Sequence, residues 1–319
     1  MMSAQQIRDR LAVPVIVAPM FLVSTPALVI AACREGLMGS FPAHATRSTE
    51  VFEAWLLEIV AALAQAAADG ENPAPFAVNL VVHPTNTRQQ ADLDLCVKYR
   101  VPVILSSKSA PGAVVERVHG YGGVVFHDIA SQRHAQKALA AGVDGLIAVA
   151  GGSGGHCGTI NPFALLNEVR QIYAGPVALA GGMSTGRDVL AAQAMGADWA
   201  YMGTRFLVTE ESAAALGHKQ MILASKATDI MFSAAIDGAP ANWLEPSLLA
   251  AGIDLDVLRT TLPGKIVSGD QTRKRWKYIW TAGHGVGNIR DLPTTQSLCR
   301  RLKQEYGEAR EGFLRARAI

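Results

Sequence analysis

The sequence predicts an α/β fold, a (β/α)8 TIM barrel with a smaller C-terminal inserted or cap domain. Eight short apolar runs alternate with Ala- and Leu-rich stretches of helical spacing over the first two-thirds of the chain. The runs are continuously apolar, which is typical of parallel strands covered on both faces. Eight strands that alternate with helices are the pattern of a barrel. The predicted strands are 13–17, 37–40, 76–81, 101–105, 123–126, 145–149, 176–180 and 199–203.

The first predicted strand argues against the rival fold, a doubly wound open sheet. Such a sheet usually carries a glycine-rich fingerprint directly after its first strand. Here that strand is followed by Ala18-Pro19-Met20, without a glycine cluster. The barrel is therefore the favoured architecture.

A recurring phrase marks two helix–strand junctions. Ala141-Gly142-Val143-Asp144 precedes the sixth strand, and Gly196-Ala197-Asp198 precedes the eighth. Glycine can end a helix in the left-handed conformation and turn the chain into the sheet. We interpret both phrases as part of the scaffold.

The strand–helix alternation stops in the C-terminal third. Residues 210–226 have a helical pattern, whereas prolines interrupt 228–288. The final stretch, 294–318, predicts an amphipathic helix with Leu298, Leu302 and Tyr306 on the face that packs on the barrel. The predicted organisation is a barrel over 1–226, a cap over 227–290 and a returning helix over 291–319.

Composition excludes several classes of protein. The chain has 319 residues, 50% hydrophobic and 18% charged, with a net charge of +2. This balance argues against a nucleic-acid binder. We find no signal peptide and expect no membrane span, the longest apolar stretch considered being 21–33. The four cysteines are far apart, which favours reduced thiols in a cytoplasmic protein.

Glycine turns follow the seventh and eighth strands. These are Gly181-Gly182-Met183-Ser184-Thr185-Gly186 and Met202-Gly203-Thr204-Arg205-Phe206. Loops after these two strands form the usual phosphate site of such barrels, and the free N–H groups of a helix start favour an anion. The alternative is that both are simply tight turns between strand and helix.

The loop after the sixth strand carries a titratable side chain. Five of the eight residues in Gly151-Gly152-Ser153-Gly154-Gly155-His156-Cys157-Gly158 are glycine. Histidine titrates near neutral pH, so His156 suits the role of a general base or hydrogen-bond donor. Alternatively, His156 caps the loop. No partner base is evident for Cys157, which we interpret as a bystander.

Other polar residues end the third and fifth strands. Asn79 interrupts an apolar run, and His127-Asp128 ends the fifth strand, so these residues could line a ligand site or close turns. The histidines lack metal-ligand spacing, and we expect no metal site. The Gly283–Asn288 segment follows Trp280 rather than a strand, so it fails the context test for a dinucleotide fingerprint.

Together these motifs resemble the nitronate monooxygenase family, formerly called 2-nitropropane dioxygenases. The resemblance runs from about Val13 to Phe206 and is weaker in the last third. Its most specific part is Gly154-Gly155-His156-Cys157-Gly158, which is similar to the family's Gly-Gly-His-x-Gly. The stretch 273–288 resembles a late family segment, with His284 in place of a Gln. The other landmarks are Ala18-Pro19-Met20, Phe76-Ala77-Val78-Asn79-Leu80, Ala180-Gly181-Gly182 and Met202-Gly203-Thr204-Arg205-Phe206.

The resemblance implies an FMN-containing barrel that oxidises alkyl nitronates with oxygen to a carbonyl compound and nitrite. His156 would be the catalytic base. The residues expected at the cofactor are Ala18, Pro19, Met20, Asn79, His127, Gly154, Gly155, Ala180, Gly181, Gly182, Met202, Gly203 and Thr204. The expected partners are a small-molecule substrate and oxygen, with no nucleic acid or membrane, and a homo-oligomer stays open.

The chain departs from many relatives near the expected site. It has Gly152-Ser153 where an acidic residue often stands, His127-Asp128 where a Lys is common, and Pro19 where Gly is usual.

Three alternative functions remain open. The barrel also resembles NAD(P)H-dependent flavin reductases acting on quinones or enoyl thioesters; cations that could serve a nicotinamide dinucleotide are Arg205, Lys226, Arg273 and Lys274. A non-catalytic flavin-binding module would make His156 dispensable. A non-flavin aldolase or isomerase would require a Schiff-base lysine or a carboxylate base at a strand end, and Lys108 is the candidate lysine.

Overall fold

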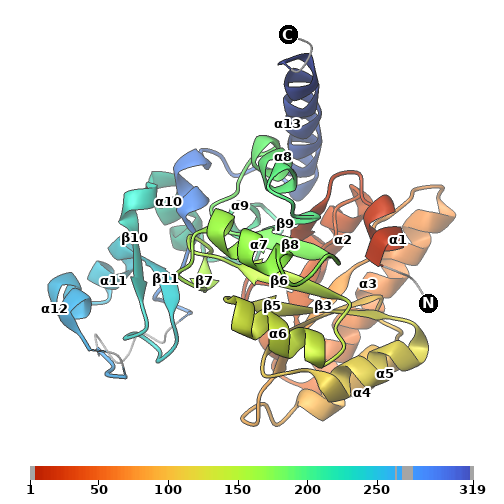
Figure 1. Ribbon diagram of the computed structural model, residues 1–319, viewed down its shortest axis with the longest axis horizontal. Helices are drawn as coiled ribbons and strands as arrows, with labels where there is room; N and C mark the ends of the chain where they lie inside the picture. The colour runs from red at the N-terminus through yellow and green to blue at the C-terminus, as the bar shows by residue number, and fades with distance from the viewer. Residues whose placement is uncertain (1–3, 263, 268–275, 317–319) are drawn as a thin grey trace.

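Eight parallel strands form a nearly closed barrel with helices between them (Figure 1). The structure is a computed structural model, and it describes residues 4–262, 264–267 and 276–316. The strand order around the barrel is β1-β9-β8-β6-β5-β4-β3-β2. The strands are β1 Val15–Val17, β2 Ser40–Pro42, β3 Ala77–Val82, β4 Val103–Lys108, β5 Val124–Ile129, β6 Gly145–Val149, β8 Val177–Ala180 and β9 Trp199–Met202.

The two ends of this strand order meet between β1 and the residues before β2. Ile16 pairs with Met38 in a parallel bridge. The Val17 N–H donates to the Met38 carbonyl at 2.8 Å, and the Met38 N–H donates to the Val15 carbonyl at 3.1 Å. The predicted eight-stranded barrel is thus confirmed. The second strand lies slightly later than predicted, because its start contributes a bridge rather than a ladder.

Helices cover the outside of the barrel and follow most strands. They are α2 Pro26–Arg34, η1 Ala43–Ala45, α3 Thr49–Ala68, α4 Gln89–Lys98, α5 Gly112–Tyr121, α6 Gln132–Ala140, α7 Pro162–Arg170, α8 Gly186–Ala194 and α9 Thr204–Leu207. The short α1, Ala4–Asp9, packs Ile7 in one cluster with the barrel-interior residues Ile16 and Trp199.

Helix α3 is long and apolar enough, by length and composition, to cross a membrane. It is not an uninterrupted apolar run, because Glu50, Glu53 and Glu58 lie within it. In the structure, α3 belongs to the barrel's outer layer, with Phe52, Leu56 and Ile59 fully buried. Core helices of globular proteins have the same composition, so this single helix is weak evidence for a membrane span.

The N-terminal ends of the strands are held by carboxylates at the two repeated junctions. Gly142 and Gly196 both have positive φ, 84° and 101°, as predicted for helix-ending glycines. Asp144 accepts from the Val125 N–H, and Asp198 accepts from the Val177 N–H. These aspartates link neighbouring strands at the end opposite to the expected site.

The smaller cap is built around an antiparallel sheet, drawn beside the barrel in Figure 1. Its strands are β10 Ile230–Ser233, β11 Ala241–Leu244 and the two-residue β7, Gly155–His156. Its surrounding elements are α10 Leu216–Ala224, η2 Ala227–Asp229, α11 Glu245–Ala250, α12 Leu255–Thr260 and η3 His284–Asn288. One strand of the cap's sheet therefore comes from the loop after β6. The proposed boundaries at residues 226 and 290 remain predictions.

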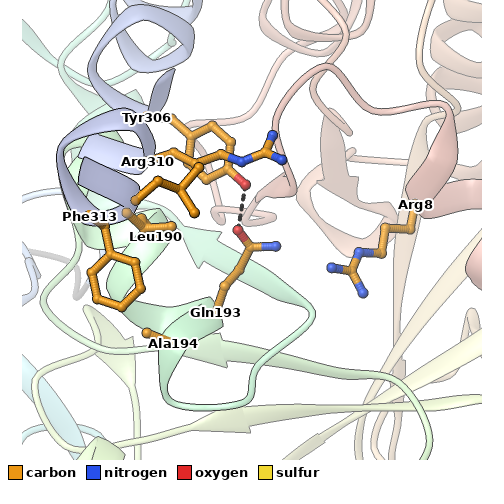
Figure 2. A pocket seen from close by; sticks show the side chains of 8 residues that line it. Arg8, Leu190, Gln193, Ala194, Tyr306, Arg310 and Phe313 are labelled. Carbon is orange, nitrogen blue, oxygen red and sulfur yellow. Dashed lines mark hydrogen bonds between the residues drawn. The ribbon is translucent and has the colours of Figure 1, made fainter. Parts of the chain in front are cut away.

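The last helix, α13 Thr295–Ala316, packs on the barrel. Leu298 and Leu302 are buried in one cluster with Val15 and Val189, and the Tyr306 hydroxyl donates to Gln193 at 2.6 Å. A cavity of about 510 Å³ lies between α8, the end of α13 and Arg8 of α1 (Figure 2). None of the predicted site residues lines this cavity, so it is not the candidate site.

Candidate active site

Three predicted glycine loops converge at the C-terminal ends of the strands. A Cβ atom on Gly154 would lie 2.9 Å from Thr204 Oγ1, and one on Gly181 would lie 2.9 Å from the Gly151 carbonyl oxygen. The loops after β6, β8 and β9 therefore pack too closely for larger residues at these positions. The sequence predicted each loop separately, and the structure brings them together.

The segment after β1 joins the same cluster. The Ala18 N–H donates to the Met202 carbonyl at 2.9 Å. A Cβ atom on Gly203 would make ordinary contacts, at 3.5 Å, with Ala18 Cβ and Met20 Sδ. Ala180 and Met202, at the ends of their strands, are buried.

Helix η3 is a fourth glycine segment at this place. Its His284 N–H donates to the Gly152 carbonyl at 2.9 Å, and a Cβ on Gly285 would lie 2.9 Å from the Gly182 carbonyl oxygen. The segment is not a dinucleotide fingerprint, but it packs directly on two of the predicted loops. Its position could be anticipated only through the family resemblance, because no strand precedes it.

The expected anion site has fewer available N–H donors than the sequence suggested. The N-terminus of α8 is already occupied by carboxylates: Asp188 accepts from the Ser184 and Thr185 N–H groups, both at 2.9 Å, and Glu305 accepts from the Gly186 N–H at 2.7 Å. This helix start therefore has little capacity for a second anion.

Free donors remain just before that helix. Among the described residues, no acceptor is bonded to the N–H of Gly182 or Met183. Thr204 Oγ1 accepts from the Gly283 N–H at 2.9 Å, which leaves its hydroxyl hydrogen free to donate. These groups could hold a phosphate where the loops after β8 and β9 meet.

The barrel mouth has a polar floor on β3, β4 and β5. Ala77, Leu105 and Phe126 belong to the interior cluster, and strand residues alternate between faces, so Asn79, Ser107 and Asp128 share that interior face two positions later. The Asn79 side-chain amide donates to the Leu105 carbonyl at 2.9 Å and lies 3.3 Å from Ser107 Oγ.

Asp128 is an incompletely partnered carboxyl in this floor. Its Oδ1 is buried and has no hydrogen-bond partner among the described residues. Burial raises the pKa of Asp128 to about 7, against the positive charge of Lys108, which lowers it. An orphaned buried oxygen in a binding mouth points to a ligand that would complete it.

His127 occupies the opposite face of β5. Its Nδ1 lies 2.9 Å from Ser106 Oγ, and burial, together with the charge of His134, lowers its pKa to about 4. The structure thus turns His127 toward the helix layer and brings Asp128 to the mouth. Because Val124, Val125 and Phe126 are all apolar, the sequence holds no signal that shows which of the two residues faces the interior.

His156 lies on β7, at the join between barrel and cap. It pairs with Ala241 of β11, and its Nε2 lies 3.1 Å from Asp237 Oδ2. Its ring meets Trp276 edge-on, with centroids 5.0 Å apart. The side chain of His156 is 40% exposed, so a substrate can reach it. Sequence reasoning missed Asp237, since nothing local relates it to a histidine 81 residues earlier.

The remaining candidates have other roles. Burial raises the pKa of the Cys157 thiol to about 11, so it is a poor nucleophile at neutral pH. Arg205 is buried and paired with Asp291 at 2.8 Å, which removes it as a dinucleotide contact. Lys108 is exposed, whereas a Schiff-base lysine is usually desolvated. Lys226, a candidate for a dinucleotide contact, is also exposed. Arg273 and Lys274 lie outside the described residues.

The sequence matches one protein family over most of its length. The family model described as nitronate monooxygenase matches residues 6–304. A nitronate monooxygenase from Paraburkholderia phytofirmans is 27% identical over 287 residues, covering 76% of each chain.

Two other relatives bear the name (3aS,4S,5R,7aS)-5-hydroxy-7a-methyl-1-oxo-octahydro-1H-indene-4-carboxyl-CoA dehydrogenase. The Mycobacterium tuberculosis protein is 30% identical over 263 residues, covering 82% of this chain and 67% of its own length. The Rhodococcus jostii protein is 33% identical over 175 residues, which is 55% of this chain and 49% of that protein.

Among solved structures, a nitroalkane oxidase from Streptomyces ansochromogenes superimposes with a TM-score of 0.79 at 23% identity, covering 96% of this chain and 99% of that chain. FabK from Thermotoga maritima gives a TM-score of 0.76 at 23% identity and covers 97% of both chains. At these identities, the two structures establish the fold alone.

Proposed function

Because this chain belongs to the nitronate monooxygenase family, whose members are flavin-dependent oxidoreductases, we propose that it oxidises alkyl nitronates with bound FMN and oxygen. The products would be a carbonyl compound and nitrite. The single observation that carries the proposal is the meeting of the Gly154-Gly155-His156 loop with the glycine loops after β8 and β9. Gly154 packs against Thr204 and lies two residues before the solvent-accessible His156, which supports a shared site for the phosphate and the substrate.

The residues at the mouth fit an FMN molecule. The N–H groups of Gly182 and Met183, which bond to no acceptor in the described part of the chain, and the Thr204 hydroxyl suit the phosphate. The nearest atom to a Cβ built on Gly182 is His284 Cβ at 4.0 Å, so the loop is open there. Asn79 and the orphaned Asp128 oxygen would meet the polar edge of the ring.

When bound, FMN would supply the redox chemistry by accepting electrons from the substrate and passing them to oxygen. The chain would bind and orient the reactants. In this proposal, His156 removes a proton from the substrate or donates a hydrogen bond to it, and the glycine loops let the backbone approach closely. The Cys157 thiol stays protonated and takes no part.

An anaerobic titration tests the proposal. The purified flavoprotein is mixed with an alkyl nitronate in one sample and with NADH or NADPH in another, and the visible flavin spectrum is followed. We expect bleaching by the nitronate and none by the nicotinamides. A protein that binds no FMN would overturn the proposal.

A pair of adjacent substitutions tests the role of His156. We expect His156→Ala to lower kcat/KM by roughly 10²- to 10⁴-fold, the usual contribution of a general acid or base, while flavin stays bound. Cys157→Ala is the matched control in the same loop and should keep wild-type turnover. Unchanged turnover in His156→Ala would remove His156 from the mechanism.

A second function is favoured by one comparison. A relative that is 30% identical over 82% of this chain carries the name of a dehydrogenase acting on a CoA thioester. Under this alternative, the chain would be an NAD(P)H-dependent flavin reductase for enoyl thioesters or quinones. Bleaching by NADH or NADPH, but not by the nitronate, would put this function first.

A further inference from the structure

We propose that Asp237 of the cap is a positioning residue that holds His156 with its proton on Nε2, leaving Nδ1 as the nitrogen that accepts a proton from substrate. The catalytic role of His156 in this inference rests on the proposed function. The tautomer of its ring does not. The inference names the reacting atom, which the family resemblance leaves open.

The carboxylate of Asp237 is fixed by contacts on both oxygens. Oδ2 lies 3.1 Å from His156 Nε2 and accepts from Trp276 Nε1 at 3.2 Å. Oδ1 accepts from the Ala239 N–H at 3.1 Å. The Asp237 side chain is only 11% exposed, so water competes weakly for these bonds.

The ionisation of the Asp237 carboxyl determines which nitrogen of the His156 imidazole carries the hydrogen. Burial raises the pKa of Asp237, but hydrogen bonds from His156 and the Ala239 N–H, the positive charge of His156 when it is protonated, and a hydrogen bond from Trp276 outweigh it, so the pKa lies below its ordinary value. An ionised carboxylate can only accept hydrogen bonds. The nitrogen facing it must then be a donor, Nε2–H, and in a neutral imidazole the other nitrogen carries the lone pair.

The second ring nitrogen is available for chemistry. No described residue donates to His156 Nδ1 through a hydrogen bond. In a proton transfer from a neutral nitroalkane, the α C–H bond would break, Nδ1–H would form, and the electron pair would stay on the substrate, which becomes the nitronate. The resulting imidazolium would be stabilised by the Asp237 charge. The serine-protease triad uses the same logic with the two ring nitrogens exchanged.

The cap holds the whole loop as well as the ring. The Asn242 side chain donates to the Ser153 carbonyl at 2.7 Å, and the Cys157 N–H donates to the Pro240 carbonyl at 3.2 Å. Trp276 also packs on the buried Trp243, with ring centroids 5.1 Å apart. These contacts restrain the backbone on both sides of His156. The hydrogen bond to Asp237 then determines the tautomer and the orientation of the His156 ring.

The test is ¹⁵N NMR of the full-length holoprotein labelled on histidine, with the His156 signals assigned from their loss in His156→Gln. We expect protonated Nε2 and unprotonated Nδ1 in the wild type. Asp237→Ala should give a mixture of tautomers. Asp237→Asn should retain Nε2–H, because Trp276 Nε1 also donates to the position that faces Nε2 and so favours the amide oxygen there. Asp256→Ala, which removes an exposed cap aspartate on α12, should change nothing.

The wild-type spectrum alone decides the inference, even if the alanine variant fails to fold. A proton on Nδ1 of His156, or an unchanged tautomer in a folded Asp237→Ala protein, overturns it. In turnover, we expect Asp237→Ala to lower kcat on the order of 10-fold or more through misorientation, with KM little changed and partial rescue in Asp237→Asn. If His156→Ala were fully active while Nε2 proved protonated, the catalytic role proposed for His156 would fail and the tautomer assignment would stand.

Discussion

Aspartates beside the strands at the two ends of the barrel differ in how completely they are partnered. At the N-terminal end, Asp198 accepts from Arg8, Arg170 and the Val177 N–H, and Asp144 accepts from the Val125 N–H and lies 2.8 Å from His119 Nε2. At the C-terminal mouth, Asp128 has an oxygen without a partner, and the Gly182 N–H lacks an acceptor among the described residues.

This difference suggests that polar groups at the N-terminal end stabilise the fold, whereas those at the mouth bind a ligand. Satisfied carboxylates tie adjacent strands together and leave nothing for a ligand. Unsatisfied groups lower the stability of the protein without ligand, and a ligand that completes them recovers that free energy. Barrel enzymes in general place binding at the C-terminal face and structural roles at the other. Substitutions at matched positions can therefore test whether this chain divides its roles in the same way.

The largest effect is expected from Gly181→Ala at the mouth. Gly181 has φ of 142°, and an added Cβ would lie 2.9 Å from the Gly151 carbonyl oxygen. The loop must shift, and a shift displaces the donors of the proposed phosphate site. We expect FMN affinity to fall by roughly 100-fold, or about 2.7 kcal/mol, measured by quenching of flavin fluorescence. Unaltered affinity would mean that this loop does not contact the cofactor.

Asp198→Ala should give the next largest effect, on stability alone. The substitution leaves Arg8, Arg170 and the Val177 N–H without their acceptor. Since Asp198 and its two arginine partners are partly exposed to solvent, we expect a loss of about 1–3 kcal/mol of unfolding free energy, measured by urea unfolding. FMN affinity should not change. Asp256→Ala is the control, because an 89% exposed aspartate should contribute under about 0.5 kcal/mol.

Asp128→Asn should stabilise the protein without cofactor, in a pH-dependent way. Burial raises the pKa of Asp128 to about 7, whereas an unfolded aspartate titrates near pH 4. Between those values, the unfolded chain has released this proton and the folded chain has kept it, so wild-type stability falls as the pH rises. The asparagine does not titrate, and its advantage should grow from near zero at about pH 4 to about 1–3 kcal/mol at about pH 8.

Urea unfolding at several pH values measures this advantage. The other titrating groups are common to both proteins, so their effects cancel in the difference. An advantage that shrinks with rising pH would show that Asp128 is ionised and stabilised in the folded protein, and the comparison between the two ends would lose its main support.

The sequence predicts the barrel well because its signals are local. Each apolar run and each glycine turn can be identified within about ten residues of chain. The cap's sheet could not be predicted, since β7 is two residues long and is a strand only because β11, more than 80 residues later, pairs with it. The Asp237–His156 contact depends on that pairing and is invisible for the same reason. His127 and Asp128 are an intermediate case, because strand alternation predicts that they face opposite ways, whereas the structure shows that Asp128 is the one on the interior face.

Gly142→Ala, at the N-terminal end, should have the smallest effect and sharpens the contrast with Gly181. Both glycines have positive φ, so alanine strains the backbone at either position. At Gly142, however, the nearest atom to an added Cβ is Val115 Cγ1 at 3.6 Å, an ordinary contact. Only the conformational cost remains, about 1 kcal/mol of unfolding free energy, and FMN affinity should be unchanged. If Gly142→Ala weakened FMN binding as strongly as Gly181→Ala, positive φ alone would explain both results. The tight packing of loops at the mouth would then no longer be what distinguishes the binding end.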